Sequence, residues 1–146
     1  MKRIALATVM TIAAGAAQAD EIVTYATDQS YDDVTFGLEN AIIEQGFTVD
    51  TVHHVSDMLE RTRADVGSDV VIYETADVFS FCSATLSRKM MEANPMNIAY
   101  CPYNIFVARV TGSDETVIGY RTLPEGEMQE VQTLLDHLAK TAIGVE

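Results

Sequence analysis

The stretch NIFVARVTGSDETVIGYRT, residues 104–122, decides the fold class. Its two ends, residues 104–110 and 116–122, are rich in β-branched and aromatic residues, which favour strands. The residues between them, Gly112-Ser113-Asp114-Glu115, are typical of a hairpin turn. Because a hairpin requires antiparallel pairing, this stretch favours an α+β fold over a doubly wound parallel sheet.

The chain on either side of the hairpin supplies further strands and helices. Strands are expected over residues 22–25, 47–55 and 69–75, the last because Val70-Val71-Ile72 is a compact apolar run suited to a buried strand. A helix is expected between Ser30, a suitable N-cap, and Gly46, a suitable C-terminal glycine.

Three more helices complete the predicted order. A short helix over residues 57–63 directs Met58 and Leu59 inward, and a longer one runs from Ser80 or Ser83 to Asn94, where Pro95 stops it. The last spans residues 125–141. The sequence thus predicts strand, helix, strand, short helix, strand, helix, strand, strand and helix, with the helices packed on one face of an antiparallel sheet.

The first 19 residues have the pattern of a cleaved signal peptide. Lys2 and Arg3 precede an uncharged apolar run, residues 4–17, and Ala17-Gln18-Ala19 has the small-x-small form of a signal-peptidase site. A run of about 14 apolar residues is shorter than the roughly 20 needed to span a bilayer. We therefore expect cleavage after Ala19, a single domain over residues 20–146, a periplasmic or secreted location and no membrane insertion after cleavage.

Net charge excludes one class of partner. The 146 residues contain 9 Lys and Arg against 22 Asp and Glu, a formal net charge of −13. Loss of Lys2 and Arg3 with the signal peptide lowers this to −15. Nucleic acids and anionic membranes require clustered basic residues, so neither is expected as a partner. With 48% hydrophobic residues, the chain has the composition of a folded globular protein.

Cys82 and Cys101 are the first candidates for chemistry. In an exported protein the pair is interpreted most simply as a disulfide, which would close a loop of about 20 residues and contribute about 3 kcal/mol. A second interpretation is a pair of buried, unreacted thiols. The third is a redox or metal-binding thiolate, with the pKa of Cys82 lowered by its place at a helix start.

The region around the two cysteines resembles a known family. Phe81-Cys82-Ser83-Ala84-Thr85-Leu86, then Asn94-Pro95, then CPYNIFV at residues 101–107 resemble the family called domain of unknown function 302. In that family a Cys-Asn-Pro opens the helix and the second cysteine follows the proline, whereas here Ser83 follows Cys82 and Cys101 precedes Pro102. The resemblance implies an α+β fold of the TATA-binding-protein-like class that is often dimeric, and it implies no established activity.

A metal site is a further hypothesis. Cys82 and Cys101 together with Met91 or Met96 form a ligand set of the kind that selects Cu(I). Adjacent residues on a strand point to opposite faces, so His53 and His54 are not expected to share an ion. The alternative is that the methionines pack in the core, as expected for Met90 four residues after Leu86.

Aromatic residues bracket both cysteines and suggest a pocket for a small ligand. The set is Tyr73, Phe79, Phe81, Tyr100, Tyr103 and Phe106. Phe81, Tyr100 and Tyr103 are the ligand candidates, and the alternative is that these rings fill the interface between sheet and helices, or a dimer contact. The chain has no HExxH, GxSxG or glycine-rich phosphate motif. We therefore expect a non-enzymatic binding or accessory module that uses residues 82–106, with a thiol-based redox or copper-handling protein as the alternative.

Overall fold

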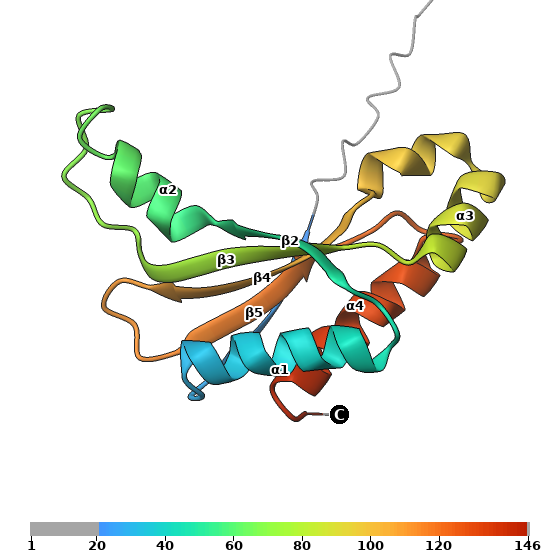
Figure 1. Ribbon diagram of the computed structural model, residues 1–146, viewed down its shortest axis with the longest axis horizontal. Helices are drawn as coiled ribbons and strands as arrows, with labels where there is room; N and C mark the ends of the chain where they lie inside the picture. Colours follow the sequence, from blue (N-terminus) through green and yellow to red (C-terminus); the bar gives the residue numbers. More distant parts are fainter. Residues whose placement is uncertain (1–20, 146) are drawn as a thin grey trace, which may run out of the picture.

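The computed structural model describes residues 21–145, and the predicted signal peptide lies outside the described residues. Along the chain (Figure 1), the elements are β1 (Ile22–Thr27), α1 (Tyr31–Glu44), β2 (Val49–His54), α2 (Val55–Thr62), β3 (Tyr73–Phe81), α3 (Ala84–Ala93), the 3-10 helix η1 (Pro95–Tyr100), β4 (Tyr103–Val110), β5 (Thr116–Arg121) and α4 (Gln129–Ala142). Within this part of the chain, no helix combines the length and the apolar character needed to cross a bilayer.

The five strands form one antiparallel sheet in the order β1-β5-β4-β3-β2. Figure 1 shows α1 and α4 on the same side of this sheet. The predicted α+β class and the antiparallel sheet with helices on one face are confirmed. The order of elements is as predicted, except that η1 was not expected. The predicted hairpin is the pair β4 and β5.

The core lies between the sheet and the two covering helices. Alternate residues of the central strands, including Ile105, Val107 and Ile118, are fully buried and face α1 and α4. Helix α1 passes so close to the end of α4 that a Cβ on Gly37 would lie 2.3 Å from the Ala142 carbonyl oxygen. Gly37 therefore permits the close approach of the two helices.

The third strand begins later than the sequence predicted. Val70, Val71 and Ile72 are 66%, 46% and 47% exposed, and β3 starts at Tyr73, which pairs with Val110 of β4. The strand expected over residues 69–75 is therefore wrong for residues 69–72, and residues 73–75 belong to β3. A continuous apolar run indicates a strand covered on both faces, whereas in this sheet the strands alternate because α1 and α4 cover one face.

Two details of the helices also differ from prediction. Met58 is 41% exposed instead of pointing inward. Helix α2 contacts β3 and lies away from the layer of α1 and α4 that covers the core (Figure 1). Helix α4 starts at Gln129 and not near residue 125, because Gly126 has a φ of +96°, which is incompatible with a right-handed helix. Helix α3 starts after Ser83, whose hydroxyl accepts a hydrogen bond from the Leu86 amide at 3.3 Å.

Asp136 on α4 ties the helix layer to the edge of the sheet. Its Oδ1 accepts hydrogen bonds from the hydroxyls of Tyr25 on β1 and Tyr120 on β5, and its Oδ2 lies 3.0 Å from Lys140 Nζ. Burial alone would raise the pKa of Asp136. The hydrogen bonds from the two tyrosines and Lys140 outweigh burial, so the pKa is lowered overall.

Replacing Asp136 with Asn tests this network. A carboxyl whose pKa is lowered on folding stabilises the native state above its ordinary pKa, and this contribution is lost as the pH falls through the lowered value. D136N should therefore lose about 1–3 kcal/mol of unfolding free energy at pH 7, measured by urea denaturation, and the loss should shrink towards pH 2.5. The exposed Asp65→Asn variant is the control and should change little at either pH. An equal loss at both pH values for D136N would contradict the role of its charge.

Candidate functional site

The pairing of β3 with β4 brings the two cysteines together. Phe81 at the end of β3 lies opposite Tyr103 at the start of β4, so Cys82 and Cys101 flank the same end of the strand pair. Their Sγ atoms are 3.1 Å apart, both side chains are half-buried, and the thiols are not bonded to each other in this structure. The two residues that the sequence singled out therefore form one dithiol site.

The environment of Cys82 disfavours its thiolate. Burial raises the pKa of Cys82 to about 11, with further contributions from the hydrogen bond to Cys101 and from the charge of Asp50. This direction is opposite to the lowered pKa expected for a helix start. Cys82 precedes the N-cap Ser83 and so lies outside the first turn of α3, where amide groups would stabilise a negative charge.

The aromatic residues beside the cysteines belong mainly to the core. Phe81 is fully buried and lies 6.2 Å from the ring centroid of Phe47 and 6.2 Å from that of Tyr103. The Ser87 hydroxyl donates to the Tyr103 hydroxyl at 3.3 Å and lies 3.9 Å from Cys101 Sγ. Burial raises the pKa of Tyr103. Phe81 thus packs the core behind the dithiol.

The other residues considered for a metal site are placed as follows. Met91 is half-buried on α3, and Met96 on η1 is 69% exposed. His54 lies on β2 with its Nδ1 2.9 Å from Asp77 Oδ1. Among residues 21–145, no cluster of three or more His, Cys, Asp or Glu side chains is arranged to hold a metal ion. Binding of copper by the two cysteines and a methionine therefore remains a hypothesis.

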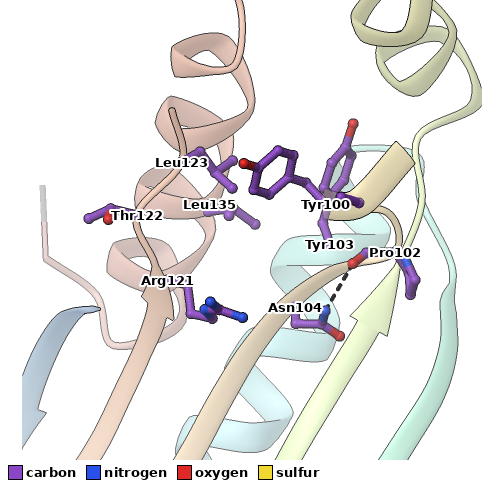
Figure 2. Close-up of a pocket in the computed structure, with 9 residues that line it drawn as sticks. Tyr100, Pro102, Tyr103, Asn104, Arg121, Thr122, Leu123 and Leu135 are labelled. Carbon is purple, nitrogen blue, oxygen red and sulfur yellow. Dashed lines mark hydrogen bonds between the residues drawn. The ribbon is translucent and has the colours of Figure 1, made fainter. Parts of the chain in front are cut away.

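A pocket lies between η1, the start of β4, the end of β5 and α4 (Figure 2), and Tyr100 and Pro102 on either side of Cys101 in the chain line it. It has a volume of about 100 Å³. This is below the roughly 300–1,000 Å³ usual for small-molecule sites, so only a ligand of few atoms would fit. Its lining combines two aromatic rings, apolar side chains and three polar ones. The residues are Ala99, Tyr100, Pro102, Tyr103, Asn104, Arg121, Thr122, Leu123 and Leu135.

Sequence reasoning found one wall of this pocket and missed the other. Tyr100 and Tyr103 were ligand candidates and line it, whereas Phe81 and Cys82 do not. Asn104 and Arg121 were missed. Asn104 and Arg121 lie opposite each other on β4 and β5, because each is two residues along its strand from the Phe106–Gly119 pair. The register of the predicted hairpin would therefore have indicated both residues.

The polar side chain of Asn104 is held firmly. Its Nδ2 donates to the Pro102 carbonyl at 2.9 Å, and its Oδ1 accepts from the Ser80 hydroxyl at 2.5 Å. Figure 2 shows the Arg121 guanidinium directed towards Asn104 at one end of the pocket, with Tyr100, Leu123 and Leu135 at the other. The pocket therefore has a polar end and an apolar end.

Comparisons with known proteins agree with this architecture. A crystal structure of an uncharacterized conserved protein DUF302 from Bacillus stearothermophilus matches with a TM-score of 0.57 and 18% identity, covering 83% of this chain and 86% of that one. At this identity the likeness shows the fold alone. No curated protein matches the chain. The model of the family described as domain of unknown function DUF302 matches residues 23–142, and the chain therefore belongs to the DUF302 family.

Proposed function

We propose that this chain is an exported, non-enzymatic module that binds a small molecule in the pocket between η1, β4, β5 and α4. The observation that carries the proposal is the pocket itself, which joins an apolar end to a polar end and is lined by Tyr100 and Pro102, the chain neighbours of Cys101. Sites for small molecules are mostly apolar, with a few polar groups that fix orientation. In this proposal the two cysteines form a disulfide in the exported protein and hold the wall of the pocket.

The wall formed by η1 has its own internal supports. The Asn94 side chain accepts a hydrogen bond from the Met96 amide at 3.0 Å, and Asn97 Nδ2 donates to the Met90 carbonyl of α3 at 2.9 Å. These bonds fix η1 against α3 without a ligand. A site formed in advance loses less conformational entropy on binding, which supports a binding role for this surface.

Two features support a disulfide. The Sγ atoms of Cys82 and Cys101 lie in contact. Because the pKa of Cys82 is raised, the reduced protein is not stabilised by a thiolate at Cys82. An external disulfide would act as oxidant: the two thiols lose two protons and two electrons and form one S–S bond, and the oxidant is reduced to two thiols. Exported proteins meet such oxidants in the periplasm.

A thiol-based redox role is the second candidate, and the contact between Cys82 and Cys101 favours it equally. Such a role requires a thiolate at neutral pH, which the raised pKa of Cys82 disfavours. The dithiol is therefore assigned first to holding the pocket. Copper handling and dimer formation stay predictions.

Export and oxidation are tested together by producing the full chain in a Gram-negative host. The periplasmic protein should begin at Asp20, and its mass after denaturation with an alkylating agent should show no labelled cysteine. The Cys101→Ser variant is the control, since its remaining Cys82 should be labelled. Retention of residues 1–19, or labelling of both cysteines in the unmutated protein, would contradict this part of the proposal.

Binding is tested by nuclear magnetic resonance titration with three small aromatic probes: benzyl alcohol, benzamide and benzoate. At least one probe should shift the amide resonances of pocket residues in a saturable manner at millimolar concentration. Tyr100→Ala should weaken this binding about tenfold or more, because it removes an aromatic wall. Tyr73→Ala, at the far end of the sheet, should leave it unchanged. If no probe shifts the pocket residues, or if Tyr100→Ala has no effect, the binding proposal fails.

A further inference from the structure

We infer that the ligand class of this pocket is a small organic anion with an apolar body, such as a carboxylate or a sulfonate. This inference rests on the proposed binding function and specifies what the site takes. Its basis is the position of Arg121 at the polar end of the pocket, opposite the leucines and Tyr100 at the apolar end (Figure 2).

The charge of the lining differs from that of the whole protein. The chain carries 22 acidic against 9 basic residues, yet the described residues that line the pocket include one arginine and no carboxylate. A strongly acidic surface repels anions in general. Within the lining of this pocket, an anion meets a guanidinium and no carboxylate, whereas a cation meets no carboxylate to pair with.

Arginine also has the geometry for this task. Its planar guanidinium carries five N–H donors and pairs with carboxylates through two parallel hydrogen bonds. Arg121 already has an interaction partner in the protein, and five donors allow it to bind a ligand oxygen as well. The rigid Asn104 side chain lies beside it and limits the position of the anionic group.

The neighbouring surface sets the direction of the ligand. Tyr100 also lines a second hollow on its other side, between η1 and the segment before α4, and that hollow contains Glu125 and Glu127. An anionic group there would face two carboxylates. The anion should therefore lie on the Arg121 side of Tyr100, with the apolar body against Leu123 and Leu135.

The test compares benzoate with benzamide, which has a similar shape and no charge. Benzoate should bind the unmutated protein about tenfold more tightly, as expected of one charge-assisted hydrogen bond. Arg121→Gln should abolish this preference, so that benzoate and benzamide bind with equal affinity. Arg121→Lys should keep part of the preference, since the charge remains without the planar fork. Arg88→Gln is the matched control, because Arg88 is exposed on α3 and pairs with Glu92.

The outcomes separate this inference from the function on which it rests. If benzamide binds the pocket as tightly as benzoate, the anion class is wrong and the binding function stands. If Arg121→Gln folds and keeps the full preference for benzoate, Arg121 is not the anion-binding residue and the inference fails. If none of the probes shifts the pocket residues, the binding function itself fails.

Discussion

The antiparallel pairing of β3 with β4 is the constraint on which the rest of the site depends. This pairing runs from Tyr73 opposite Val110 to Phe81 opposite Tyr103. A shift of one residue would exchange the faces of every side chain and place Phe81 and Ile105 outside the core. The same register brings Cys82 to Cys101 and orients Tyr103 towards the helices, so core and site are fixed by one set of hydrogen bonds.

The second constraint is that α1 and α4 cover the same face of the sheet. On the opposite face, the Phe106 ring lies over Gly119, where a Cβ would be 2.8 Å from the ring. Strands in such a sheet alternate between buried and partly exposed residues. The hairpin was predictable because its turn residues and strand composition are local properties. The start of β3 was not, since the apolar run at residues 70–72 is outside the pairing with β4, and only the partner strand defines that boundary.

The candidate site, too, was predictable only in part. Cysteines and aromatic residues are rare enough that their clustering in the sequence pointed to residues 82–106. Arg121 and Leu135 come from distant parts of the chain and join the pocket only through the sheet register and the packing of α4. One of the three interpretations of the cysteines supposed a lowered pKa for Cys82, whereas burial beside Cys101 and Asp50 raises it. Position at a helix start is visible in a sequence, but burial is a tertiary property.

The reduction potential of the Cys82–Cys101 pair decides whether the two cysteines form a stable structural disulfide, as their role in holding the pocket wall requires. The raised pKa of Cys82 removes the thiolate stabilisation that makes catalytic disulfides easy to reduce. Equilibration of the purified protein with defined thiol–disulfide buffers, followed by alkylation and mass measurement, gives the potential. A stable structural disulfide should have a potential more negative than about −270 mV, the potential of thioredoxin. A less negative value would contradict it and favour a redox-active pair.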